Sequence, residues 1–350
     1  MKKNRFFMST VVLLSLTLLV GCWDIKEIDK RDIPLIIGIR KESDNQFKVT
    51  LYIPRTEKGS KLSRTVTYKG TNVSSILEQL KTNTENALYY KQVRLILIQN
   101  NFSKDKADIS EMIHFLMKSK EIPSIALLAI TDEHIEKMFS SIDEKIDAHA
   151  TSVIDYFYKG ADWAPEITTT RVWEVYRSLF SYTKDIAVPV VNAGKDTLFN
   201  FEGSAVLKNG KIIEQISPSE NQFVNLFQKL HAKGKVESLG YASIMVENSS
   251  LRIKPSKKAG ELLVASDLSL KIDVLEKNEG VTNDQIQRDL ESLIEKRFYN
   301  LFEQAQKNKT DIFGFGQHFR NQIPYNELEN WREDYYPKLK VNFQVHVKME

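Results

Sequence analysis

Cys22 is the only cysteine in the 350-residue chain, and it closes an apolar run that begins at Phe6. A chain with one thiol cannot form an intrachain disulfide, so its fold must be stabilised by core packing. The composition allows this, because 42% of the residues are hydrophobic and 27% are charged, as in ordinary globular proteins. Residues 22–350 are enough for two or three domains.

The segment before Cys22 has the features of a secretory signal peptide. Three cations stand within the first five residues, and the apolar run 6–20 follows them. As a helix this run would reach only about 22 Å, well short of the roughly 30 Å of a bilayer core. We therefore predict that residues 1–21 are a signal peptide and not a membrane-spanning helix.

Residues 19–22 read Leu-Val-Gly-Cys and resemble the lipobox of bacterial lipoproteins. In a lipobox the cysteine sulfur receives a diacylglyceryl group, and the chain is then cut just before it. The resemblance implies that Cys22 is lipidated and is the first mature residue. Two or more acyl chains hold a protein stably at a membrane. The alternative is a buried structural cysteine in an N-terminal helix.

The charge balance argues against a nucleic-acid binder. The chain has 49 Lys and Arg residues against 46 Asp and Glu residues, a formal net charge of +3. All three extra cations lie in residues 1–21, so the chain from Cys22 onward is neutral. Binding to phosphate backbones needs a surplus of cations.

Hydrophobic periodicity predicts an α+β fold made of two or three mixed sheet-plus-helix domains. The expected strands of the first part are 33–39, 47–53, 65–68, 93–98 and 125–130, and helices are expected from Val73, from Ile109 and between 133 and 180. Strand, helix and strand at these lengths favour a βαβ crossover with parallel pairing.

The expected domains are 22–196 and 197–350, and a division of the second near 235 is the alternative. The boundary is placed in 189–197, which mixes Pro, Gly, Asn and Asp. A hairpin around Asn209-Gly210 and a capping box at Ser217 follow it. Strands 268–274 and 339–347 flank a long helix that starts after Thr282. They predict a C-terminal antiparallel sheet packed on that helix.

No motif for catalysis or metal binding stands out, and we predict neither an enzyme nor a cofactor. The six histidines show no HxH or HExxH spacing, and there is no G-x-S-x-G elbow. A wall hydrolase would need a carboxylate pair, and the candidates are Asp24/Glu27, Glu291/Glu295 on an expected solvated helix face, and Glu327/Glu329. Chance alone produces such pairs among 46 acids.

Two features leave alternatives open. Tyr156, Phe157, Tyr158 and Trp163 could line a sugar or amino-acid pocket, although aromatics at helical spacing are more often core. The stretch 311–316 (DIFGFG) contains a GxG but lacks the third glycine of a dinucleotide loop and follows a helix. It is either a tight helix exit that turns its phenylalanines into the core or a surface for partner subunits.

Several of these residues together resemble the Ger(x)C family of spore germination lipoproteins. The resemblance rests on Cys22, Trp23, Asp24 and Glu27, on VRLILI at 93–98, on FEGSAVLK at 201–208 with Gly203, on Asp311, Gly314 and Gly316 of DIFGFG, and on Trp331 with the closing strand. These occur in the family order and cover nearly the whole chain.

The resemblance implies the C subunit of a nutrient germinant receptor. Such a subunit is a non-enzymatic lipoprotein that is anchored to the spore inner membrane, faces outward, and works with an A-type and a B-type membrane subunit. Cys22 would carry the lipid, and the other family residues would mark a signature or an interaction surface. A rival reading is a solute-binding lipoprotein that captures a nutrient directly, in a cleft between two lobes.

Overall fold

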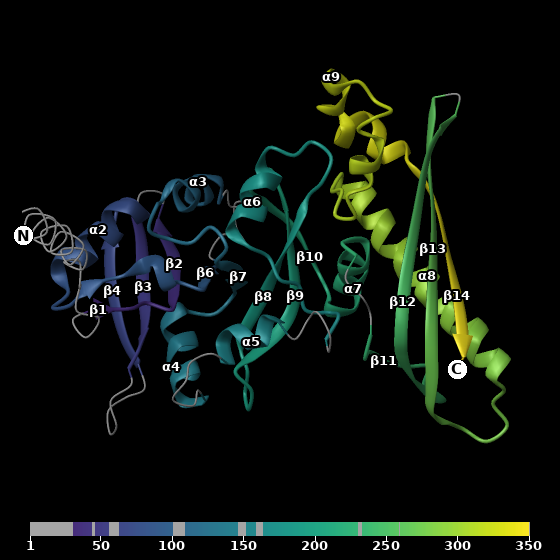
Figure 1. Cartoon of the computed structure of the whole chain (residues 1–350), viewed down its shortest axis with the longest axis horizontal. Helices are drawn as coiled ribbons and strands as arrows, with labels where there is room; N and C mark the ends of the chain where they lie inside the picture. Colours follow the sequence, from purple (N-terminus) through teal and green to yellow (C-terminus); the bar gives the residue numbers. More distant parts are fainter. Residues whose placement is uncertain are drawn as a thin grey trace, which may run out of the picture.

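The computed structural model describes residues 31–43, 46–55, 63–100, 109–145, 152–158, 164–229, 233–258 and 260–349. The predicted signal peptide and Cys22, Trp23, Asp24 and Glu27 lie outside these residues. Two sheets organise the molecule: an eight-stranded sheet with helices on both faces, and a four-stranded sheet packed on one long helix (Figure 1). The predicted α+β class is confirmed.

The larger sheet has the strand order β10-β9-β8-β7-β6-β2-β3-β4. Its strands are β2 (Ile36–Ser43), β3 (Gln46–Pro54), β4 (Ser63–Gly70), β6 (Leu95–Gln99), β7 (Leu127–Thr131), β8 (Ile186–Ala193), β9 (Phe199–Lys208) and β10 (Lys211–Ile216). The first three form antiparallel hairpins, whereas β2, β6 and β7 run parallel. The expected hairpin and the expected parallel crossover are both confirmed. A separate parallel pair joins β1 (Arg31–Asp32) to β5 (Ala87–Leu88).

Helices cover this sheet on both faces because its strands carry apolar side chains on both. The helices are α2 (Val73–Asn83), α3 (Ser110–Lys118), α4 (Ile135–Lys145), α5 (Ser152–Tyr158) and α6 (Val172–Leu179). Ile37 and Ile39 of β2 belong to the same cluster as α2, α3 and α6, and Ile36 belongs to the cluster of α4 and α5. This alternation is the period of two that a buried strand shows. Phe157 is buried, and both Phe157 and Tyr156 pack against Phe199, which supports the core reading for these two aromatics. Trp163 and the Tyr158 side chain lie outside the described residues.

The stretch expected as the domain boundary is partly strand. β8 runs through Pro189 to Ala193, and it pairs with β7 at a single position, Ile130 with Val190. A proline lacks the N–H that a central strand needs, and this short pairing accommodates it. Since β9 pairs with β8, one sheet continues past residue 196. The chain passes from the eight-stranded to the four-stranded sheet between β10 and β11, close to the subdivision expected near 235.

The smaller sheet has the order β11-β12-β13-β14. Its strands are β11 (Val236–Ser238), β12 (Ala242–Lys258), β13 (Glu261–Lys277) and β14 (Lys340–Met349), and its helix is α8 (Asn283–Asn308). The first three strands pair antiparallel as predicted, but β14 runs parallel to β13, so the prediction is wrong for this pair. The reason is the connection, since α8 carries the chain back to the end of the sheet where β13 begins.

Helix α8 also covers the outer edge of β14. The backbone N–H groups of Val345 and Val347 donate to the carboxylates of Glu295 and Glu291, at 2.9 and 2.8 Å. The N–H of Phe343 donates to the Tyr299 hydroxyl at 3.0 Å. An uncovered edge strand invites pairing with another chain, so these side chains protect it. Glu291 and Glu295 are therefore not the solvated pair that their spacing suggests.

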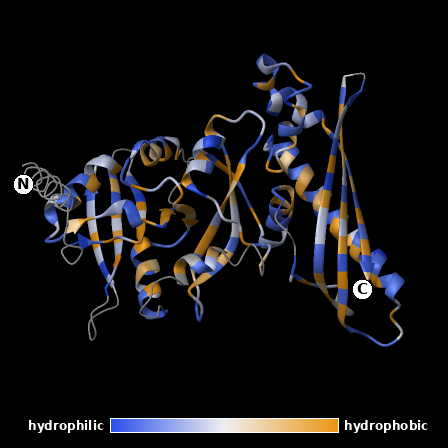
Figure 2. Cartoon of the chain, in the orientation of Figure 1, coloured by the Kyte–Doolittle hydropathy of each residue, from blue (hydrophilic) through white to orange (hydrophobic). Residues whose placement is uncertain are grey.

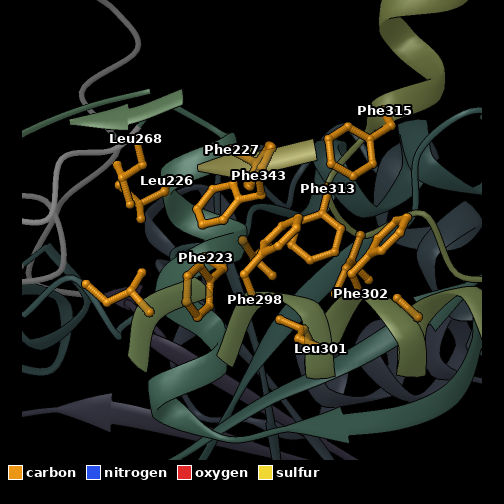
Figure 3. Close-up of a cluster of buried hydrophobic side chains, with 14 of the residues drawn as sticks. Phe223, Leu226, Phe227, Leu268, Phe298, Leu301, Phe302, Phe313, Phe315 and Phe343 are labelled. Carbon is orange, nitrogen blue, oxygen red and sulfur yellow. The ribbon is translucent and has the colours of Figure 1, made fainter. Parts of the chain in front are cut away.

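Phenylalanine rings fill the core between the two sheets (Figure 3). Phe298 of α8 stacks on Phe343 of β14 with a centroid distance of 4.1 Å. Phe227, from α7 (Pro218–Phe227), packs edge-on against Phe315 at 5.1 Å. Apolar residues line the inward side of α8 and of the strands it faces, and polar residues lie outside (Figure 2). Helix α7 follows β10 of the larger sheet, and this core packs it against α8 and the smaller sheet.

Candidate functional site

Asp311 stands where the chain leaves α8, and its side chain is fully buried. One carboxylate oxygen accepts the N–H of Phe315 at 2.9 Å. The other accepts the N–H of Gly316 at 2.8 Å and the indole N–H of Trp331 at 2.9 Å. These bonds fold the segment into a tight turn that continues as the short helix η5 (Phe315–Phe319). The turn points Phe313 and Phe315 into the core, as the helix-exit reading expects.

Asp185 connects this turn to the larger sheet. It directly precedes β8, is 1% exposed, and exchanges two bonds with Asp311. The Asp311 N–H donates to the Asp185 carboxylate at 2.7 Å, and the Asp185 N–H donates to the Asp311 carbonyl at 2.9 Å. Two distant segments are thereby joined through buried polar groups, which we call the junction.

Arg332 completes the junction. Its guanidinium donates to both carboxylate oxygens of Asp185, at 3.1 Å from Nε and 2.7 Å from Nη2. It also donates to the carbonyl of Ser181 at 2.6 Å. Such a two-pronged pair is strong and geometrically specific. Arg332 belongs to η6 (Trp331–Tyr335), so the two neighbouring side chains Trp331 and Arg332 contact Asp311 and Asp185 respectively.

Two glycines of the signature are required by space and by backbone conformation. Gly314 has a φ of +71°, a left-handed conformation that side chains disfavour. A Cβ on Gly316 would lie 2.6 Å from the Trp331 indole and 2.8 Å from Thr183. The Thr183 hydroxyl accepts a hydrogen bond from Gln317 across the junction. The smallest residue at 316 thus allows the turn, the indole and the larger sheet to meet.

Gly203, the remaining described family residue, lies elsewhere. It is in β9 with a φ of +101°, and a Cβ there would overlap the Ile216 carbonyl oxygen at 2.0 Å. It stands next to the irregular pairing of β8 with β9 between Val190 and Val191. Gly203 therefore shapes a strand pairing and is not part of the Asp311 hydrogen-bond network.

Burial changes the acid–base behaviour of the junction. Burial raises the pKa of Asp311 to about 7 from the ordinary 3.8, although the N–H groups of Gly316 and Phe315 act to lower it. Burial also raises the pKa of Asp185, and the Arg332 guanidinium opposes this shift. The Asp311 carboxyl consequently titrates near neutral pH, far from the range of an exposed aspartate.

Further polar contacts join the two sheets. Glu214 of β10 accepts hydrogen bonds from three residues near the end of α8: Gln304 at 2.8 Å, Asn308 at 2.6 Å and Thr310 at 2.8 Å. The buried Asn225 of α7 donates to the carbonyls of Pro165 and Ile167, at 2.7 and 3.1 Å. The relative position of the sheets is therefore fixed at several points.

A groove of about 660 Å³ opens beside the junction. Thr183 and Lys184 line it from the side of the larger sheet, and Gln317 and Arg320 line it from the turn after α8. Among the described residues, the Lys184 ammonium has no hydrogen-bond or ion-pair partner. Burial lowers the pKa of Lys184, and the nearby Arg177 adds to the shift.

Exposed aromatic rings surround the groove. Phe180 is 59% exposed and Tyr325 is 72% exposed, and both line it. Large exposed aromatic side chains beside cations are more common at binding surfaces than on the rest of a protein surface.

The sequence did not indicate Asp185 or Arg332. Asp185 lies 126 positions from Asp311 and 147 from Arg332, and neither residue stands in a motif. The only local signal was Trp331, which the family resemblance included and which directly precedes Arg332. A contact between distant segments leaves no periodicity in either of them.

The described part of the chain contains no cluster of His, Cys, Asp and Glu suited to a metal ion. Within the same residues, no helix is both long and apolar enough to cross a bilayer. The Glu327 and Glu329 carboxylates accept from the hydroxyls of Tyr335 and Tyr182. Each of the two glutamates therefore contacts a different tyrosine.

An eight-stranded and a four-stranded sheet joined in this way define a class of α+β protein, and a solved structure has the same fold. The structure titled "Crystal Structure of the GerBC protein" matches with a TM-score of 0.58 at 13% identity, over 89% of this chain and 96% of that one. At this identity the match shows the fold.

Two family models match the sequence of this chain. The model described as "Spore germination protein N-terminal domain" matches residues 24–193, and "Spore germination B3/ GerAC like, C-terminal" matches residues 202–350. The chain belongs to the Ger(x)C family of spore germination proteins, as its signature residues predicted.

Curated relatives agree along nearly the full length. Spore germination protein KC of Bacillus subtilis (strain 168) is 20% identical over 98% of this chain and 94% of its own length. The putative spore germination protein YfkR of the same organism is 22% identical over 89% of this chain and 87% of its own. Both names connect the family with germination.

Proposed function

We propose that this chain is the lipid-anchored, non-enzymatic subunit of a spore nutrient germinant receptor. It is needed for the germination response, and it works with an A-type and a B-type membrane subunit at the outward face of the spore inner membrane. The observation that carries the proposal is the match of both family models in order along one chain that begins with a lipobox at Cys22.

The proposed role of the lipid is to confine the protein to the layer where its partners lie. Confinement makes association effectively intramolecular, so that modest interfaces suffice. The short spacing supports this, because Arg31, the first residue of β1, stands only nine positions after Cys22. A short connection keeps the body close to the bilayer.

The test is Cys22→Ala in spores, with Ser15→Ala in the signal peptide as the matched control. We expect Cys22→Ala to remove the protein from the membrane fraction and to abolish nutrient germination, while Ser15→Ala leaves both unchanged. Immunoblots of fractions and loss of spore refractility measure the two outcomes. Full germination at native abundance without membrane association would contradict the proposal.

A second candidate, direct capture of a nutrient, is favoured by the junction groove. Its volume of about 660 Å³ lies in the range of small-molecule sites, and Lys184 offers an unpaired charge. Calorimetric titration of the mature chain with amino acids and sugars tests it. Binding that Lys184→Met removes supports this candidate. Absence of heat for all of these compounds rejects it.

A further inference from the structure

Three unpaired cations gather at one end of the larger sheet. Lys91, Arg94 and Arg171 form no ion pair with any described residue, and the first two are exposed. They line a depression of about 560 Å³ whose lining includes no acidic residue. Ile125, which is 63% exposed, lies among them. We call these four residues the basic end.

The chain enters the fold at this same end. β2, β6 and β7 are neighbouring parallel strands, so their first residues lie side by side (Figure 1). The N–H of Arg94 donates to the carbonyl of Leu35 at 2.9 Å, and the N–H of Leu127 donates to the carbonyl of Arg94 at 2.7 Å. With strands about 4.8 Å apart, Ile125 lies within roughly 10 Å of the start of β2.

The chain between Cys22 and Arg31 limits how far this end can lie from a lipid on Cys22. Nine positions separate Cys22 from Arg31, and an extended chain of that length spans at most about 30 Å. The Arg31 guanidinium lies 5.2 Å from the ring centroid of Tyr89, which directly precedes η2 (Tyr90–Gln92) and its Lys91. A lipid on Cys22 would thus hold the basic end within reach of headgroups.

The nearby side chains suit a membrane surface. Asp32 is paired with Arg64 at 3.3 Å and Glu121 with Lys81 at 2.7 Å, so these two acids do not neutralise the basic end. The Glu174 carboxylate accepts the backbone N–H of Arg171 at 2.8 Å, which leaves the basic end with a cationic excess of two. Trp173 is half-buried, and its backbone N–H donates to the carbonyl of Ser124 next to Ile125. Trp is enriched at membrane–water interfaces, where an exposed apolar side chain can also be buried.

We propose that the basic end binds the headgroups of anionic phospholipids and turns this end of the sheet toward the bilayer. Where it acts depends on the proposed anchor, but the binding itself does not require the lipid. Each cation near an anionic surface strengthens binding by roughly fivefold, so three together give about 100-fold. The attraction should weaken as salt screens it.

The test uses the mature chain with Cys22→Ser, which keeps every described residue and has no lipid. Co-sedimentation compares vesicles of phosphatidylcholine alone with vesicles in which about a third is phosphatidylglycerol. We expect binding to the anionic vesicles that is lost in the triple variant Lys91→Glu, Arg94→Glu and Arg171→Glu. Circular dichroism and thermal unfolding verify that this variant is folded.

The matched control reverses three exposed lysines of the smaller sheet, Lys254→Glu, Lys258→Glu and Lys348→Glu, with the same change in net charge. It should retain at least half of the wild-type binding. Equal binding to both vesicle types, or an equal loss in the control, would overturn the proposal. Since no lipidated protein is present, this result is independent of the Cys22→Ala experiment.

Discussion

The indole N–H of Trp331 donates a 2.9 Å hydrogen bond to the carboxylate of Asp311, and both side chains are fully buried. The bond joins η6 to the turn after α8. Arg332 follows Trp331, and its guanidinium donates two hydrogen bonds to the Asp185 carboxylate. One short segment therefore connects the signature turn to the larger sheet. The family signature at 311–316 is therefore buried at an internal junction.

Trp331→Phe should lower the free energy of unfolding by at least about 1–3 kcal/mol, because a buried carboxylate oxygen loses a donor and the smaller ring also leaves a cavity. Urea unfolding followed by circular dichroism measures this. The control is Trp173→Phe, whose half-buried indole makes no hydrogen bond among the described residues. Equal losses in the two variants would show that the bond to Asp311 contributes nothing.

Gly316→Ala should destabilise the protein by more than about 2 kcal/mol, because the new Cβ overlaps the Trp331 indole at 2.6 Å. The comparison is Gly280→Ala, where φ is +82° but nothing lies within 4 Å of the added carbon. That variant should lose only the left-handed strain, about 1–2 kcal/mol. Thermal unfolding compares the stability lost by the two variants. A larger loss in Gly280→Ala than in Gly316→Ala would contradict the steric explanation.

Arg332→Met should cost about 3–5 kcal/mol, since it leaves the Asp185 carboxylate buried without its partner. The exposed pair of Lys340 with Glu261, 2.9 Å apart, provides the control, and Lys340→Met should cost less than about 1 kcal/mol. Adding Asp185→Asn removes the charge and keeps an acceptor oxygen for the Asp311 N–H, so restored stability in the Arg332→Met protein would confirm that the unpaired charge is the cause. No gain from the second substitution would refute it.

Stability should fall as pH rises from about 4 to 7. Burial raises the pKa of Asp311 from 3.8 to about 7, so in this window the native state retains a proton that the unfolded chain has released. The free energy of unfolding then decreases with pH, by at most about 4 kcal/mol from this group. Asp311→Asn cannot titrate, and should flatten this slope in urea unfolding at several pH values. Asp273→Asn, at an exposed position, should leave the slope unchanged. An unchanged slope in Asp311→Asn would show that Asp311 is not the titrating group.

Removing the cover from β14 should cause association between chains. In a variant with Glu291→Ala and Glu295→Ala, the N–H groups of Val345 and Val347 lose their acceptors and are free to pair with another strand. Sedimentation velocity should show larger species that grow with concentration. Replacing both residues by Gln keeps an acceptor oxygen and should prevent this, as should the exposed control Glu303→Ala with Glu279→Ala. Unchanged sedimentation of the alanine pair would show that α8 protects the edge without these carboxylates.

Local patterns predicted the elements well, because they depend on neighbours in the sequence. Asn209 and Gly210 both have positive φ, as a two-residue hairpin turn requires. Ser217 and Glu220 form the expected reciprocal capping box, and Thr282 accepts from the N–H of Gln285. The domain boundary placed at 196/197 stays a prediction, because β8 pairs with β9 across it while the two family models end at 193 and begin at 202.

The sequence by itself determined the α+β class, the long helix after Thr282, the family, and the prediction that Cys22 is the anchor. Only the tertiary structure decided that β14 runs parallel to β13, that Glu291 and Glu295 cover its edge, and that Asp311 meets Asp185 and Arg332. The physical reason is range. Hydrophobic periodicity and capping act over a few residues and are visible in the sequence. The junction forms between segments more than a hundred positions apart, which only the packed core brings together.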